Sequence, residues 1–200
     1  MDTQEHILSQ VDSLFSQYGI KSITMDDIAK HLGMSKKTIY QHFEDKNDLV
    51  LTLMRSKMDL QTCTIDDCTA KADNAIHELF LTIINMVEML SKINPTMILD
   101  LQKYYPEAWA YFRNFRENVL LQKIKDNLVW GIKEGYFRPE IDVDIISRMR
   151  VEQIELSLNQ QIFPAHHFSM SQVGKELTLH FLYGICTLKG LEMVKYYEEQ

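Results

Sequence analysis

A short segment near the N-terminus carries six polar side chains of types that hydrogen-bond to nucleic acids: Lys36, Lys37, Thr38, Tyr40, Gln41 and His42. The two lysines can reach phosphates or the acceptor atoms of guanine, and the threonine and glutamine can bond to base edges. The tyrosine and the histidine have flat rings with a polar end, which can contact sugar and phosphate. This chemistry needs a rigid element that holds the six side chains outward or sideways.

The residues around this segment predict two short helices joined by a tight turn. Thr24 is suited to cap the first helix, and two aspartates follow in its first turn, where the helix dipole favours negative charge. Gly33 occupies a place where helices often end on a left-handed residue, and Ser35 can cap a second helix over residues 36–43. Apolar residues at helical spacing must point inward together: Ile28, Ala29, Leu32, Ile39 and Phe43.

This pattern predicts a helix-turn-helix, in which the second helix lies in the DNA major groove. Asp45 can cap a further helix, with Asp48 three residues later, so that the backbone N–H groups near Lys46 form a seat for a phosphate. The alternative interpretation is a small helical hairpin with a solvated face. The predicted DNA-binding residues are Thr24, Ser35, Lys36, Lys37, Thr38, Tyr40, Gln41, His42 and Lys46.

The string ITMDDIAKHLGMSKKTIYQHFEDKNDLV, with the preceding ILSQVDSLFSQYGIKS, resembles the DNA-binding domain of the TetR (tetracycline repressor) family of bacterial regulators. The remainder of the chain agrees with that family only in length and all-helical layout. The resemblance implies a homodimer. Each subunit would have a three-helix DNA-binding head, residues 1–47, and a larger body, residues 48–200, for effector binding and dimerisation. It further implies a repressor that a small effector releases from a palindromic operator.

Helical periodicity continues along the rest of the chain, and no strand-like alternation appears. We therefore predict an all-α fold of about nine helices, with a polar domain boundary at residues 62–75. The predicted helices cover about residues 3–18, 25–32, 36–43, 46–63, 72–91, 96–103, 106–134, 143–162 and 170–197.

Composition limits the function classes. The chain is 46% hydrophobic but has no apolar run of membrane-spanning length and no signal peptide, so a soluble, cytoplasmic protein is expected. Three cysteines, an odd number, then predict reduced thiols. No catalytic spacing or glycine-rich phosphate loop is present, so we expect neither an enzyme nor a cofactor. A metal at the adjacent His166 and His167 is an alternative to a surface role for that pair.

The charge balance argues against nucleic-acid binding. The whole chain has a net charge of −7, and residues 1–50 carry five lysines against eight acidic residues. Most of these acids fall on the first helix or near the start of the second, whereas Lys36, Lys37 and Lys46 fall on the predicted DNA face. We expect weak non-specific binding. A helical ligand-sensing or protein-interaction module without operator binding remains the alternative.

The body is rich in methionine and aromatic residues, which suit an adaptable apolar cavity between the fifth and seventh helices. The expected effector is uncharged or amphipathic with a sizeable apolar part, and the alternative is a solid core that binds nothing small. The candidate ligand-binding residues are Met86, Met89, Met97, Tyr104, Trp109, Phe112 and Trp130.

The resemblance implies that the last two predicted helices build the dimer interface, and the sequence of the last one allows it. Gly184 and Gly190 lie inside a long apolar helix, where glycine costs about 1 kcal/mol relative to alanine. Such residues are understandable where another helix must approach closely. The predicted dimer interface comprises Val173, Leu177, Phe181, Gly184, Ile185 and Leu188.

Overall fold

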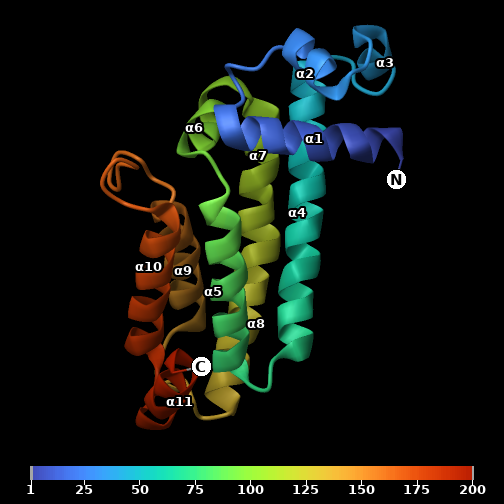
Figure 1. Ribbon diagram of the computed structural model, residues 1–200. Coiled ribbons are helices and arrows are strands. Elements are labelled where there is room, and N and C mark those ends of the chain that lie inside the picture. Colours follow the sequence, from blue (N-terminus) through green and yellow to red (C-terminus); the bar gives the residue numbers. More distant parts are fainter. Residues whose placement is uncertain (1, 200) are drawn as a thin grey trace. The chain divides into compact units, whose positions relative to one another are not determined.

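The computed structural model describes residues 2–199, which form eleven α-helices, one π-helical segment and no β-strand (Figure 1). This confirms the predicted all-α class. The elements are α1 (Thr3–Tyr18), α2 (Met25–Leu32), α3 (Lys36–Tyr40), α4 (Lys46–Lys71), α5 (Ala75–Ser91), α6 (Pro95–Tyr104), α7 (Pro106–Asn114), the π-helix η1 (Phe115–Leu120), α8 (Leu121–Lys133), α9 (Val143–Leu156), α10 (Met170–Ile185) and α11 (Leu188–Glu198).

The chain divides into two compact units. Residues 1–60 with 92–114 form one, here called the head unit, and residues 61–91 with 115–200 form the other, the body unit. None of the helices in the described part of the chain is both long and apolar enough to cross a membrane.

The head unit has one hydrophobic core to which distant parts of the sequence contribute. Phe15 of α1, Ile39 of α3 and Leu49 of α4 are fully buried in it. The α6–α7 segment adds four residues to the same cluster: Met97, Leu101, Tyr105 and Ala108. The helix-turn-helix therefore shares its core with α6 and α7, although the whole of α5 lies between them in the sequence.

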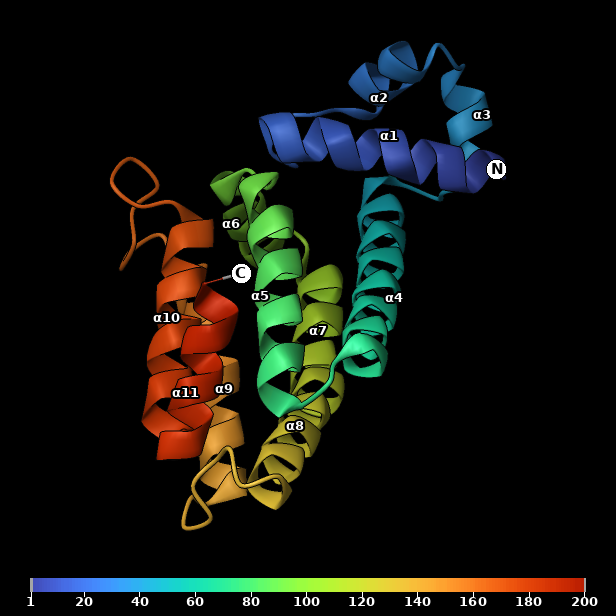
Figure 2. The ribbon, with the colours of Figure 1, turned by 60° about the horizontal axis from the view of Figure 1, so that its bottom comes forward.

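The body unit has a hydrophobic core of its own, built by α5, α8 and α10. Ile76 of α5, Leu128 of α8 and Leu182 of α10 are fully buried in it, together with Phe137 from the connector after α8. α5 packs along α10, as both views show (Figures 1 and 2). The apolar stripes of these helices are thus largely covered within the protomer.

Two predicted helix ends are wrong. The polar stretch after residue 62 does not end α4, which continues to Lys71. Ile65 and Cys68, three residues apart, are buried there, so the polar residues simply occupy the outer face of a continuing helix. The predicted helix 143–162 ends at Leu156 instead, and the Asn159 side chain accepts a hydrogen bond from the Gln161 backbone in the turn that follows.

Two long predicted helices are interrupted. The helix predicted over residues 106–134 contains the π-helical turn η1 between α7 and α8. The helix predicted over 170–197 breaks at Cys186, whose backbone is extended, and restarts when Thr187 caps α11 by accepting a hydrogen bond from the Gly190 N–H (3.1 Å). The Thr187 N–H donates to the Tyr136 carbonyl (2.9 Å), so a tertiary contact fixes this break.

The two glycines of this region have different surroundings. A Cβ on Gly190 would overlap the Tyr136 carbonyl oxygen, whereas a Cβ on Gly184 would meet nothing within 4 Å. Gly190 therefore permits a close approach within the chain, which corrects the expectation that it serves a helix of a second copy.

Gly190→Ala should lower the free energy of unfolding by about 1–3 kcal/mol, because the added methyl group must displace backbone. Gly184→Ala is the matched control and should be neutral or stabilise by up to about 1 kcal/mol through helix propensity. Urea unfolding of the two variants measures the difference. Equal stabilities would contradict the close approach at Tyr136.

Candidate nucleic-acid interface

The caps predicted for the helix-turn-helix are present. The Thr24 hydroxyl accepts a hydrogen bond from the Asp27 N–H (3.2 Å), and the Asp27 carboxylate accepts from the Thr24 N–H (2.8 Å). Gly33 ends α2 with φ +63°, the left-handed conformation that favours glycine. The Ser35 hydroxyl then accepts from the Thr38 N–H (3.1 Å) to begin α3 (Figure 1). Local hydrogen bonds thus fix the turn between the two helices.

The second helix is shorter than predicted. α3 ends at Tyr40, and Gln41 to Phe43 form a turn outside the helix. This turn still bonds back to α3, since the N–H groups of Gln41 and Phe43 donate to the carbonyls of Lys37 and Ile39, both at 3.1 Å. Gln41 and His42 therefore remain attached to the same short element as the rest of the predicted recognition residues.

The segment of α3 and the turn after it has a buried side, which packs in the head core, and an exposed outer face. Ile39 and Phe43 are buried in the head core, as the four-residue spacing predicted. Lys37, Gln41 and Tyr40, which is 46% exposed, form the open face. No described residue hydrogen-bonds to or pairs with the Lys37 ammonium. The face therefore offers a cation, an amide and a phenol to a ligand.

Other predicted contact residues already have partners within the head unit. The hydroxyls of Ser35 and Thr38 are 2.8 Å apart, and the Thr24 hydroxyl donates to Asp27. Lys36 pairs with Asp26 at 2.6 Å, but both side chains are exposed. Such exposed pairs contribute little to stability, so this lysine can exchange its carboxylate for a phosphate.

Lys46 does not face outward, and that expectation is wrong. Its ammonium donates to the carbonyls of Ile20 (2.6 Å) and Ile23 (2.5 Å), and it lies over the rings of Phe15 and Tyr105. Burial lowers its pKa from the usual value for lysine. The long side chain reaches back to the chain that leaves α1, so Lys46 stabilises the head unit from within.

The acidic residues of the head are largely occupied by structural bonds. Asp12 pairs with Lys57 at 2.7 Å, and the Asp45 carboxylate caps α4 by accepting from the Asp48 N–H (2.8 Å). Hydrogen bonds from the Thr24 side chain and backbone lower the pKa of Asp27, and backbone hydrogen bonds, first that from Asp48, lower that of Asp45. The negative charge is therefore held at helix starts and in pairs, apart from the open face of α3.

Contacts between the start of the chain and α6 are a part of the head unit that sequence reasoning missed. The Lys21 N–H donates to the Asp100 carboxylate (2.8 Å), and the Lys21 ammonium donates to the Tyr104 hydroxyl (2.8 Å). The Asn94 side chain, at the cap of α6, donates to the Gln17 carbonyl (3.1 Å). These partners lie far apart in the sequence, and no local pattern signals them.

The predicted effector residues are divided between the two units. Met97 is buried in the head core, and Trp109 and Phe112 pack against it with ring centroids 5.3 Å apart. Met97 is therefore core packing, which corrects its assignment to a cavity of the body. In the body unit, Met89 is 40% exposed. Two further predicted effector residues of the body unit, Met86 and Trp130, are partly buried.

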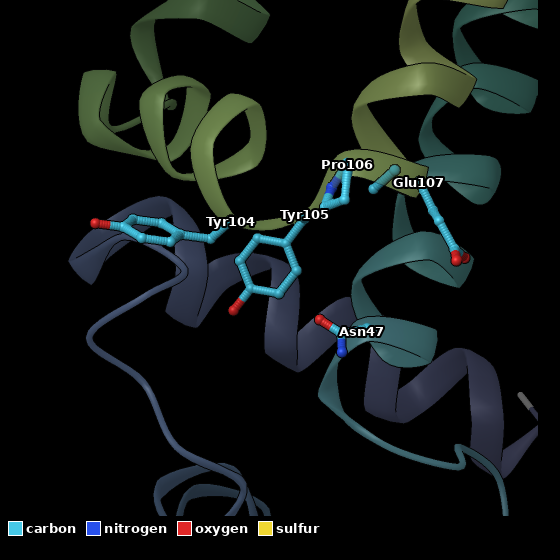
Figure 3. A pocket seen from close by; sticks show the side chains of 6 residues that line it. Asn47, Tyr104, Tyr105, Pro106 and Glu107 are labelled. Carbon is cyan, nitrogen blue, oxygen red and sulfur yellow. The ribbon is translucent and has the colours of Figure 1, made fainter.

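A small pocket of the head unit includes only one of these candidates, Tyr104. It has a volume of about 200 Å³ and lies where α6 passes into α7 beside the first turn of α4 (Figure 3). Its lining residues are Asn47, Tyr104, Tyr105, Pro106, Glu107 and Ala108. The pocket is too small for a large apolar effector, since ligand sites typically measure about 300–1,000 Å³.

Three members of the predicted dimer interface are buried within their own chain. Val173, Phe181 and Ile185 belong to the interior of the body unit, so their side chains are not available to a second copy. This part of the prediction is corrected, because the apolar stripe of this helix packs inside its own protomer. Leu177 is partly buried, and Gly184 and Leu188 are exposed.

Comparison with known proteins gives a consistent picture. Residues 7–53 match the family described as bacterial regulatory proteins, tetR family. The chain is 25% identical over 186 residues to the HTH-type transcriptional repressor KstR2 of Mycobacterium tuberculosis, with 90% of each chain covered.

Two solved structures have the same fold. The structure of the ketosteroid transcriptional regulator KstR2 of Mycobacterium tuberculosis superposes with a TM-score of 0.61 and 23% identity, covering 93% of this chain and 96% of that one. The transcriptional regulator FadR from Bacillus subtilis, in complex with stearoyl-CoA, gives a TM-score of 0.68 at 17% identity, covering 90% and 97%.

Proposed function

This chain belongs to the TetR family of bacterial transcriptional regulators, and we propose that it represses genes by binding a palindromic operator as a homodimer. The observation that carries the proposal is the capped helix-turn-helix with Lys37, Tyr40 and Gln41 on its open face. α3 of each subunit would enter the major groove, with the two copies about 34 Å apart, one turn of DNA.

We assign the DNA contacts from the charged or hydrogen-bonding group that each side chain can offer to the duplex. Lys37 and Lys36 bind phosphates or guanine, Gln41 and Thr38 reach base edges, and Tyr40 contacts the backbone together with His42. Thr24 and Ser35 act through the helix starts that they cap, where backbone N–H groups attract phosphate. Lys46 is left out of the contact set because its ammonium is bonded within the head unit.

Release by an effector follows from a two-state equilibrium in which the ligand prefers the state that does not fit the operator. Three stretches of chain connect the units: one within α4, one between α5 and α6, and one where α7 passes into η1. A change in the body unit can reach the head through each of them. The α7 route leads to α6, whose Asp100 and Tyr104 bond to Lys21 near the helix-turn-helix.

The effector class is inferred from the body unit and from relatives. One relative is a regulator described as ketosteroid-related, and another was crystallised with stearoyl-CoA. Together with the methionines and aromatic residues of this chain, these two relatives support an amphipathic effector with a large apolar part. Because the protein acts on an operator, we place it in the cytoplasm and assign it no enzymatic activity.

The second candidate is a ligand-sensing module without operator binding, favoured by the net negative charge of the head. Selection of full-length protein against a library of random duplexes separates the two. A repressor enriches one palindromic sequence, hereafter the selected duplex. Recovery of no common sequence would overturn operator binding and leave the sensing module.

A further inference from the structure

The inward face of α9 carries polar side chains where a helix of a packed body normally has apolar ones. Ser147, Arg150 and Ser157 are buried, and the Oε1 atom of Gln153 is buried without a hydrogen-bond partner. The two serine hydroxyls are satisfied, because they donate to carbonyls of their own helix. Arg150 and Gln153, one turn apart, are the side chains of this face whose hydrogen-bonding capacity is left unused.

Arg150 has little to compensate its charge. Its side chain is 5% exposed, and it donates one hydrogen bond, to the Thr178 hydroxyl of α10 (2.6 Å). The guanidinium carbon lies 5.0 Å from the centre of the Phe181 ring. No carboxylate of residues 2–199 pairs with it. By contrast Arg116, the other buried arginine, pairs with Glu152 and Glu155.

A buried guanidinium is costly when one neutral hydroxyl is its main partner. Burial lowers the pKa of Arg150 to about 10, so the group still carries its charge at neutral pH. An acceptor with a full negative charge would satisfy the donors that Thr178 leaves free. The position of the cation inside the body unit is thus explained if an anion enters there.

The surroundings give this site an apolar side. The Thr178 hydroxyl donates to the Gly174 carbonyl one turn earlier on α10 (2.7 Å). A Cβ at Gly174 would lie 3.0 Å from the end of the Met86 side chain and 3.4 Å from Leu90, both on α5. In both views α10 runs beside α5 and beside α9 (Figures 1 and 2). Soft apolar side chains of a third helix therefore pack against α10 one turn before Thr178, the hydrogen-bond partner of Arg150.

We propose that Arg150, held in place by its hydrogen bond to Thr178, binds a carboxylate head group of the effector, whose apolar part packs along Met86, Leu90 and Phe181. The planar guanidinium matches a carboxylate with two parallel hydrogen bonds. One guanidinium balances one negative charge, so the ligand class is an amphipathic monocarboxylic acid. This inference rests on the proposed effector-controlled function and narrows its ligand.

Thermal unfolding of the full chain tests the site with octanoic, dodecanoic and hexadecanoic acids and their methyl esters as probes, below micelle-forming concentrations. At least one acid should raise Tm by mass action, and its ester should not. Arg150→Met should weaken the apparent affinity for that acid by about 10- to 100-fold. Arg148→Met, the same change at an exposed position of α9, should respond like the wild type.

A second readout needs no ligand. Without any probe, Arg150→Met should melt no lower than the wild type, because it exchanges an uncompensated buried charge for an apolar side chain. A lower Tm would mean that the guanidinium is structural and would overturn the proposal. So would a wild type that no acid stabilises, equal responses to acid and ester, or an unchanged acid response in Arg150→Met. Failure of the duplex selection would instead overturn operator binding, whatever the acids do.

Discussion

The full chain with Lys37 and Tyr40 both replaced by alanine should bind the selected duplex at least about 100-fold more weakly than the wild type. Each side chain is exposed on the open face of α3, and the proposed homodimer would lose every contact twice. A contact to a base or phosphate is worth about 1–3 kcal/mol. Fluorescence anisotropy at several salt concentrations measures the loss, and the salt dependence should flatten because a phosphate contact is gone.

The matched control replaces Lys195 and Tyr196, an exposed lysine and tyrosine of α11, by alanine. This variant should bind the duplex like the wild type. Neither double variant should change the free energy of unfolding by more than about 0.5 kcal/mol per site, since all four side chains are at the surface. Unchanged DNA affinity in the α3 variant would place the DNA contacts elsewhere on the molecule.

Leu101→Ala, in α6, should destabilise the head unit by about 2–5 kcal/mol and abolish DNA binding with it. Leu101 is 2% exposed and belongs to the cluster that also holds Phe15 and Ile39. Truncating it leaves a cavity beneath the helix-turn-helix, although the residue lies far beyond α3 in the sequence. Urea unfolding followed by circular dichroism gives the stability, and anisotropy gives the affinity.

Leu99→Ala is the control on the same helix, because Leu99 is 46% exposed. It should leave both stability and DNA binding close to those of the wild type. If the two leucine variants behaved alike, α6 would not complete the core of the DNA-binding unit. The route proposed for effector release through α6 would then lose its physical basis.

The local part of this fold was predictable from the sequence. Thr24, Gly33 and Ser35 act through hydrogen bonds and backbone angles within a few residues, which a linear pattern can encode. The four-residue spacing of Ile39 and Phe43 likewise identified the buried side of the recognition element. Such features depend on neighbours along the chain and carry over directly to the structure.

What the sequence could not predict depends on partners far along the chain. From the sequence Lys46 is expected to be a surface cation. In the fold, its ammonium donates to the carbonyls of Ile20 and Ile23, which are distant in the sequence. No proline or glycine marks the break at Cys186 in the sequence. The break depends instead on the hydrogen bond from the Thr187 N–H to the distant Tyr136 carbonyl. Arg150 was not singled out, since its burial against Thr178 depends on how α9 packs on α10.

Composition alone also could not separate packing from ligand contact. Met97 and Phe181 are apolar residues on helical stripes, and both are buried in the interior of their own units. An apolar stripe predicts that something covers it but does not say whether that is the same chain, a second copy or a ligand. Only the structure therefore shows that Met97 and Phe181 are packing residues of their own units.

Sequence-specific DNA binding is tested most directly by the ratio of two affinities of the full chain, for the selected duplex and for a scrambled duplex of the same composition. At near-physiological salt the selected duplex should bind at least about 1,000-fold more tightly. The net charge of −7 makes the scrambled duplex a weak ligand, so specific contacts must supply most of the difference. Equal affinities, or no binding to either duplex, would contradict a repressor that reads its operator through α3.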